Sequence, residues 1–231
     1  MPVALIIGAG ANIGQACAET FAAAGYKVAV ASRSQKLDSS KFPFFSFDAA
    51  DPKAVPPLFE KVTKEVGVPS VVVYNVYAAS PIRDAKFDID TVEAFQQRMN
   101  INTTSPVVAA HEAVKGFEAL DAKGKLGPEG ATFIFTGNAA NEKPFPGFMT
   151  LGIGKTASAH MIQSLALFAT KDKPFSFYYG DERQADGAPM YNGLLNGDAH
   201  AEEYLKLARD PKQGHWQYTF VKGKGYVDFS K

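Results

Sequence analysis

Val3-Ala4-Leu5-Ile6-Ile7-Gly8-Ala9-Gly10-Ala11-Asn12-Ile13-Gly14 joins five consecutive apolar residues to a glycine-rich turn. An unbroken apolar run is typical of a strand buried on both faces of a parallel sheet. Ile13, Cys17 and Phe21 then fall at helical spacing. Such a turn brings backbone N–H groups and the N-terminus of a helix toward a pyrophosphate. The stretch predicts the first strand, turn and helix of a dinucleotide-binding fold.

The glycine spacing in this turn is G-x-G-x-x-x-G, one residue longer than the common dinucleotide fingerprint. A tight strand–helix turn without a ligand is the alternative explanation. The flanking strand and amphipathic helix supply the context that the cofactor interpretation requires. The predicted cofactor contacts in this turn are Gly8, Gly10, Asn12, Ile13 and Gly14.

Short apolar runs alternate with amphipathic helical patterns along the rest of the chain. Strands are expected at 27–31, 44–47, 71–74, 132–135, 175–179 and 216–221, and helices around 55–66, 102–117, 157–168 and 201–208. Strand–helix alternation builds a parallel sheet through right-handed crossovers. The expected fold class is α/β: one Rossmann-type domain over 1–231, a doubly wound parallel sheet with helices on both faces.

The composition argues against several kinds of partner. Lys plus Arg equals Asp plus Glu, 24 each, so nothing favours a nucleic acid or an anionic membrane. The single cysteine, Cys17, excludes an internal disulfide framework and fits a reducing compartment. The N-terminal residues are interpreted as a buried strand and not as a signal peptide. We therefore expect a cytoplasmic protein with a small-molecule substrate, no nucleic acid, no membrane and no metal site.

The cofactor type is predicted from Ser32-Arg33-Ser34 at the end of the second strand. An NAD site usually offers a carboxylate there, whereas an arginine suits the 2′-phosphate of NADP. No acid lies between Lys27 and Lys36, and Arg33 can grip a phosphate with its planar fork. A solvated surface arginine is the alternative. The prediction is NADP(H).

Two further polar residues follow predicted strands. Asp48 comes after the third strand, where a side chain can reach an adenine edge, although an ordinary turn aspartate explains it nearly as well. Asn75 closes the fourth strand at the carboxyl edge, where ligands sit in such sheets. It can instead hold neighbouring backbone, so a structural role stays open.

These segments, in this order, resemble the short-chain dehydrogenase/reductase family along essentially the whole chain. Tyr74-Asn75-Val76-Tyr77 falls where the family has N-N-A-G, and Tyr179-Gly180 stands for its P-G. Asn102 matches the asparagine that opens the long central helix, and Lys155 the lysine of Y-x-x-x-K. The resemblance implies a nicotinamide cofactor, with Lys155 on its ribose and Asn102 anchoring a water.

The departures from the family lie at the catalytic positions. Leu151 occupies the tyrosine position, and the serine falls on Gly137 or Asn138. A divergent branch of the family, which carries a strand-end V-Y-N and a T-G-A at the serine site, resembles the chain more closely. Leucine cannot donate a proton, and such a donor contributes on the order of 10² to 10⁴ in rate.

Several groups can be weighed as replacements for the lost donor. Lys155 can deliver a proton itself, or only grip the ribose, and Asn138 can hydrogen-bond an oxyanion without acting as an acid. Three tyrosines, Tyr77, Tyr178 and Tyr179, lie near the carboxyl edge of the sheet. Each can be a displaced proton donor or a residue that only packs there. The predicted catalytic set is Lys155, Asn102 and Asn138.

The segment 181–199 falls where the family places its substrate lid, and an unstructured surface loop is the alternative. The resemblance also implies a homodimer or homotetramer formed through the helices at 102–120 and 156–169. Two functions remain in view. The first is an NADP(H)-dependent oxidoreductase acting on a small carbonyl or imine compound, and the second is a catalytically inactive protein that binds NADP(H).

Overall fold

A single sheet of eight strands forms the centre of the fold, in the order β3-β2-β1-β4-β5-β6-β7-β8. The computed structural model describes residues 1–79, 90–169, 171–191 and 193–229. Neighbouring strands are parallel from β3 to β7, and β8 is antiparallel to β7. The strands are β1 (Val3–Ile7), β2 (Lys27–Ser32), β3 (Phe44–Ser46), β4 (Val71–Tyr74), β5 (Ala131–Thr136), β6 (Phe175–Glu182), β7 (Gln217–Val221) and β8 (Gly225–Tyr226).

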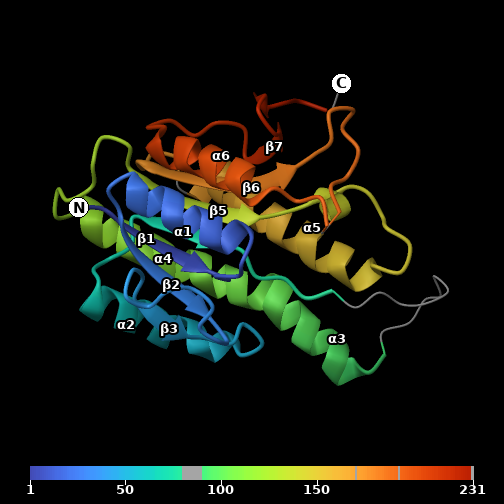
Figure 1. Cartoon of the computed structure of the whole chain (residues 1–231), viewed down its shortest axis with the longest axis horizontal. Coiled ribbons are helices and arrows are strands. Elements are labelled where there is room, and N and C mark those ends of the chain that lie inside the picture. Colours follow the sequence, from blue (N-terminus) through green and yellow to red (C-terminus); the bar gives the residue numbers. More distant parts are fainter. Residues whose placement is uncertain (80–89, 170, 192, 230–231) are drawn as a thin grey trace.

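Helices cover both faces of the sheet (Figure 1). The helices are α1 (Ile13–Ala23), α2 (Val55–Glu65), α3 (Val92–Met99), α4 (Ser105–Asp121), α5 (Met149–Ser164) and α6 (Gly197–Arg209). One core packs α1 and α6 against the sheet, and a second core packs α2, α4 and α5 against the opposite face. The predicted fold class is confirmed.

Strand β1 contributes to both cores. Leu5 and Ile7 point into the core under α2, α4 and α5, whereas Ala4 and Ile6 point into the core under α1 and α6. All five of its residues are buried. The apolar run at the start of the chain is therefore unbroken for the reason predicted from the sequence: the strand is covered on both faces.

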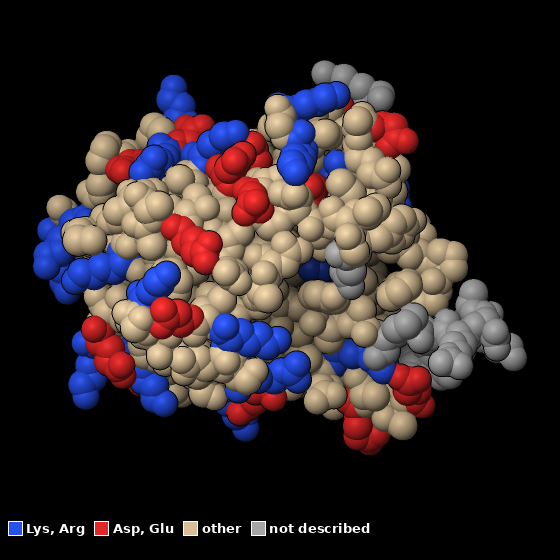
Figure 2. Space-filling model, in the orientation of Figure 1, with Lys and Arg blue, Asp and Glu red and all other residues tan. Residues whose placement is uncertain are grey.

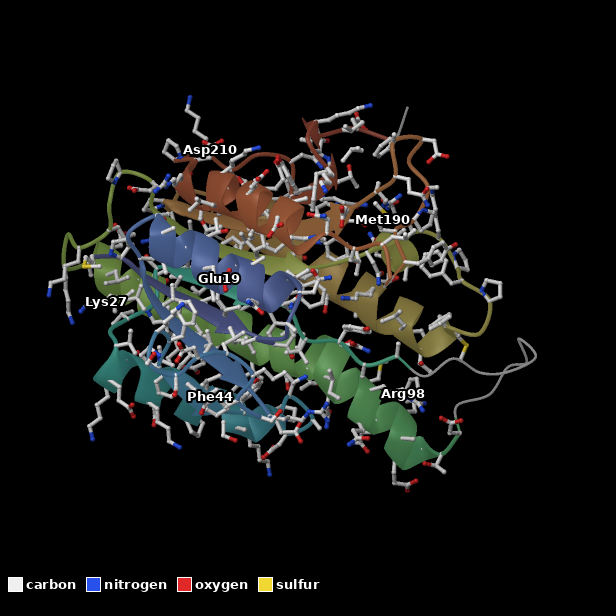
Figure 3. The ribbon with its side chains drawn as sticks, in the orientation of Figure 1. Glu19, Lys27, Phe44, Arg98, Met190 and Asp210 are labelled. Atoms are coloured by element: carbon white, nitrogen blue, oxygen red, sulfur yellow. The ribbon has the colours of Figure 1, made fainter. Side chains whose placement is uncertain are left out.

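The carboxyl ends of the parallel strands lie at one end of the molecule. In Figure 3, Lys27 at the start of β2 and Asp210 after α6 mark the left end. Met190, between β6 and α6, and Arg98 on α3 lie at the other end. The strand order reverses between β1 and β4, so this end is where a doubly wound sheet places its ligand.

The central helix differs from the prediction at its start. Asn102 does not open it: α3 already runs from Val92, and 100–104 forms a π-helical segment between α3 and α4. Pro106 has no N–H to donate to the Asn102 carbonyl four residues earlier. The Ser158 hydroxyl donates to that carbonyl instead, at 2.6 Å. The proline and a serine from α5 thus explain the widened turn.

Some elements have no clear signal in the sequence. Helix α3 is eight residues long and buries only Arg98, and β8 is two residues long. Phe168, which extends the apolar spacing of α5, is 78% exposed. It belongs to a second π-helical segment, 165–169, and in a wider turn the spacing of an ordinary helix no longer holds.

The lid-like segment is shorter than 181–199. Asp181 and Glu182 belong to β6 and are buried, and 197–199 belongs to α6. The connection therefore spans 183–196, with residue 192 outside the described residues. Arg183 pairs with Pro189 in an antiparallel bridge, so the first half of the connection is a compact turn. Whether it closes over a substrate stays a prediction.

Among the described residues, the face formed by α1 and α6 carries no large patch of one charge (Figure 2). Figure 2 shows acidic and basic side chains interspersed there, as expected for zero net charge. In the described parts of the chain, none of the helices combines the length and the apolar character needed to cross a membrane.

Candidate functional site

The glycine turn after β1 depends on close backbone packing. Gly8 has a φ of +96°, and a Cβ there would lie 2.7 Å from the carbonyl carbon of Asn75. A Cβ on Gly14 would lie 2.5 Å from the carbonyl oxygen of Gly8. Gly10, by contrast, has nothing within 4 Å of where its Cβ would be. Two glycines close the turn and the third leaves the backbone open to a ligand.

A cleft of about 600 Å³ lies against this turn at the carboxyl edge of the sheet. It is lined by the glycine turn, the ends of β2 and β4 and the residues after β3: Gly8, Gly10, Ser32, Arg33, Ser34, Lys36, Asp48, Asn75, Tyr77 and Ile101. The structure therefore brings most of the predicted cofactor contacts together around one cavity. Lys36, which the sequence analysis did not select, is a second cation on its wall.

The cationic wall of the cleft has no internal partner. Arg33 and Lys36 are both exposed, and no ion pair links either to another residue in the described ranges. The Ser32 hydroxyl donates to the Ser34 carbonyl at 2.8 Å and so fixes the turn that carries Arg33. Asp48 uses Oδ1 to accept from the Ala50 N–H, as an ordinary turn aspartate does.

The remaining predicted cofactor residues act mainly on the backbone around the turn. The Asn75 amide donates to the Gly8 carbonyl at 3.0 Å, which ties β4 to the glycine turn. The Asn12 amide donates to the Leu195 carbonyl at 3.1 Å and ties the turn to the 183–196 connection. Ile13 is buried in the core beneath α1, so only its backbone can reach a ligand.

Lys155 is the one lysine of α5 and is almost fully buried, at 2% exposure. Its Nζ donates to the Thr136 carbonyl at 2.7 Å and lies 4.5 Å from the centroid of the Phe135 ring. Burial lowers the pKa of Lys155 to about 7, and the carboxylate of Asp181 opposes that fall. An ammonium with this pKa gives up its proton readily near neutral pH.

Gly137, one of the two positions at which the sequence comparison places the serine, is closed by an aromatic ring. A Cβ on Gly137 would overlap the ring of Tyr179. That ring stacks on Phe135, and its hydroxyl donates to the Asn138 carbonyl at 2.8 Å. A serine therefore cannot occupy position 137 unless Tyr179 moves. Leu151, one turn before Lys155, is itself 6% exposed.

The side-chain oxygens of the other two catalytic candidates are engaged by backbone N–H groups. The side chain of Asn138 accepts from the Ala140 N–H at 3.0 Å. The side chain of Asn102 accepts from the Ala78 N–H and donates to the Ala78 carbonyl, at 2.9 and 2.8 Å. Asn102 thereby fixes the segment after β4 that lines the cleft.

Two of the three tyrosines weighed as displaced donors lie in the interior with their hydroxyls bonded to backbone carbonyls. Tyr178 and Tyr179 are fully buried, and burial raises the pKa of each phenol. Tyr178 faces the core under α1 and α6 and donates to the Lys212 carbonyl. Tyr77 is 47% exposed and lines the cleft.

Replacing Gly137 with serine is expected to destabilise the protein. The added Cβ forces the Tyr179 ring out of its place, and overpacking of this kind costs about 1 to 3 kcal/mol. Urea unfolding measures the loss. Gly152→Ala is the control, because its Cβ comes no closer than 3.4 Å to the Ala140 carbonyl oxygen. Equal stability of Gly137→Ser and the wild type would contradict the packing described here.

A buried charged cluster continues β6 beyond the tyrosines and was not predicted. Asp181 and Arg183 are 0% and 1% exposed, and the Arg183 Nε donates to Asp181 Oδ2 at 2.6 Å. Arg183 also pairs with Glu142 at 3.2 Å. Burial raises the pKa of Asp181 to about 7, and the Arg183 guanidinium opposes the rise. The charged run Asp181-Glu182-Arg183, which closes the apolar pattern of this strand, was the available signal.

Comparison with known proteins gives consistent matches. A family model described as short chain dehydrogenase matches residues 2–173. The "Short chain dehydrogenase/reductase dmxR12" of Cryptosporiopsis sp. (strain 8999) is 47% identical, over 99% of this chain and 95% of that protein.

Solved structures share the fold at low sequence identity. The 3-ketoacyl-(acyl-carrier-protein) reductase from Brucella melitensis complexed with NADH has a TM-score of 0.76 at 17% identity, covering 96% of this chain and 97% of that one. A metagenomic short-chain oxidoreductase in complex with NADP has a TM-score of 0.76 at 15% identity, with 95% and 96% covered. The NADPH-dependent 3-quinuclidinone reductase from Rhodotorula rubra has a TM-score of 0.76 at 20% identity, with 98% and 91% covered.

Proposed function

The chain belongs to the short-chain dehydrogenase/reductase family, an oxidoreductase family, and from that premise we propose that it reduces a small carbonyl or imine compound with NADPH. The observation that carries the proposal is the buried Lys155 amine. It lies at the carboxyl edge of the sheet, one turn after Leu151, the position at which the family has its tyrosine.

The cleft suits a dinucleotide with a 2′-phosphate. Gly8 and Gly14 close the turn while Gly10 leaves room for a pyrophosphate to approach. Arg33 and Lys36 stand on the wall without carboxylate partners in the described residues, so both charges are available to a phosphate. Structures of this fold carry NADP in one case and NADH in another, and the two cations favour NADP(H) here.

Lys155 would supply the proton. When bound, NADPH supplies a hydride to the carbonyl carbon and is oxidised to NADP⁺. The Lys155 ammonium then gives a proton to the carbonyl oxygen: one N–H bond breaks, one O–H bond forms, and the amine regains a proton from water. A pKa lowered to about 7 by burial makes the ammonium a stronger acid than an exposed lysine.

Asn102 and Asn138 would support this step without transferring a proton. Asn102 holds the segment after β4 in place through both of its amide atoms. The backbone N–H of Asn138 donates to the Tyr179 hydroxyl, which holds the turn after β5 close to the Thr136 carbonyl that Lys155 contacts. Neither amide is acidic near neutral pH.

The test is NADPH oxidation by the purified protein against a panel of small ketones, aldehydes and cyclic imines. NADPH binding is measured in parallel by the fluorescence of the reduced nicotinamide. The proposal expects binding and at least one substrate that is turned over. Binding without turnover on every compound would favour the alternative, a protein that holds NADP(H) without catalysis, which the loss of both the serine and the tyrosine supports.

The oligomeric state stays a prediction. Val107 on α4, Ile153 on α5 and Phe168 beyond it are exposed apolar residues, at 44%, 44% and 78%. They lie within the two segments, 102–120 and 156–169, or next to them, through which we expect a homodimer or homotetramer to form. Sedimentation equilibrium tests this, and a monomer at micromolar concentration would contradict it.

A further inference from the structure

We propose that Asp181 is a positioning residue for the proton donor: its carboxylate, at the end of β6, keeps the Lys155 amine charged and so ready to give up a proton. The proposal rests on the function proposed above for Lys155. Asp181 thereby gains a role at a position where the sequence analysis expected only the beginning of a loop.

Strand alternation and register place the two groups on one side of the sheet. Lys155 reaches β5 through the Thr136 carbonyl, and Thr136 pairs with Gly180, the residue before Asp181. On β6, Phe177 and Tyr179 enter the core under α5. Asp181 is the next residue in this alternation, so its side chain faces the layer from which Lys155 comes.

The Asp181 carboxylate is incompletely satisfied. Its Oδ2 accepts from the Arg183 Nε at 2.6 Å, whereas Oδ1 is buried with no hydrogen-bond partner among the described residues. A buried carboxylate oxygen without a partner is costly unless a charge nearby compensates for it. Lys155 is such a charge, because Asp181 raises the pKa of Lys155 and Lys155 lowers the pKa of Asp181.

The charges that face this pair are balanced in number. Arg183 from β6 contacts Asp181, and Glu142, from the segment before α5, contacts Arg183 and interacts with Asp181. Two cations therefore stand against two carboxylates. The phenols of Tyr179 and Tyr204 also lie within the field of Asp181, and burial keeps both protonated.

Removing the Asp181 charge leaves the cations in excess. Lys155 then loses its proton at a lower pH, because an opposite charge nearby normally favours the charged form of an amine. Glu182, the next residue, offers a matched control. It is also buried but points to the other face, where its Oε2 lies 3.4 Å from His200 Nδ1.

The experiment is an NMR titration of lysine ¹³Cε shifts in the full chain, with Lys155 assigned from its absence in Lys155→Met. The wild-type midpoint is expected near 7. In Asp181→Asn it should fall by about one unit, and in Glu182→Gln it should stay at the wild-type value. Asp181→Asn and wild type titrating alike would overturn the proposal.

A reciprocal measurement covers the case in which Asp181→Asn does not fold. Coupling between two titrating groups is mutual, so loss of the Lys155 charge must raise the pKa of Asp181. The ¹³Cγ titration of Asp181 in Lys155→Met should move to higher pH than in the wild type. No movement would overturn the proposal as well.

The titrations need neither substrate nor cofactor, so their outcome is separate from that of the proposed function. Once a substrate is found, the alkaline limb of the rate profile should move to lower pH in Asp181→Asn and stay in place in Glu182→Gln. A merely structural role for Asp181 would lower the rate at every pH without moving the limb, and that result would overturn the assignment.

Discussion

Lys155→Met is expected to slow reduction by about 10² to 10⁴, the range that a positioned general acid contributes. Methionine keeps most of the side-chain volume in this buried place but has no proton to give and no charge. The rate should be measured as a single turnover with NADPH at saturation, so that weaker cofactor binding does not enter it.

The saturating condition separates the two roles of the lysine. If Lys155 only grips the nicotinamide ribose, Lys155→Met raises the Kd for NADPH and leaves the saturated rate close to that of the wild type. That result would remove the lysine as proton donor. Lys115→Met is the control, because Lys115 lies on α4 away from the Asp181 and Arg183 contacts and its Nζ pairs with Glu112.

Arg33→Asp should weaken NADPH binding on the order of a hundredfold and leave NADH nearly unaffected. A hydrogen bond to a charged group contributes about 1.5 to 3 kcal/mol, and the substituted carboxylate also repels the 2′-phosphate. Lys36 stays on the same wall, so binding should not be lost entirely. Calorimetry with both cofactors measures the ratio of the two affinities.

Lys41→Asp controls for the change in net charge. Lys41 is exposed as Arg33 is, but it does not line the cleft beside the glycine turn. It should leave both affinities at the wild-type value. If Arg33→Asp weakened NADH as much as NADPH, the arginine would not be reading the 2′-phosphate and the cofactor assignment would fail.

The sheet was predictable because its signals are local. A strand buried on both faces must be apolar throughout, and β1 and β4 are. Helix α2 shows a regular apolar stripe because one of its faces is solvated. Elements whose form depends on distant residues gave no such signal. At the π-helical turn, Pro106 offers the Asn102 carbonyl no N–H, and its side-chain donor is Ser158, which lies 56 residues away.

The site was predictable where backbone geometry imposes residue type. Gly8 and Gly14 leave no room for a Cβ, so the glycine turn is visible in the sequence itself. The glycine at position 137 is explained by Tyr179, 42 residues later, whose ring fills the space that a side chain at position 137 would need. From sequence alone this position looked only like a loss.

The buried charges were missed for a related reason. Asp181 and Arg183 read as the beginning of a polar loop, because charged residues are almost always exposed unless they are paired. Asp181 and Arg183 pair with each other. Arg183 also pairs with Glu142, before α5, and Asp181 interacts electrostatically with Lys155, on α5. The pairing appears only once the strand order is known.

The central claim is that a buried lysine replaces the tyrosine as acid. Its most direct test is the pH profile of the wild-type single-turnover rate, measured with saturating NADPH. An acid must hold its proton to donate it, so the rate should fall as pH rises through about 7, the pKa to which burial lowers Lys155. A rate that stays level up to about pH 10, where an ordinary tyrosine titrates, would contradict the account.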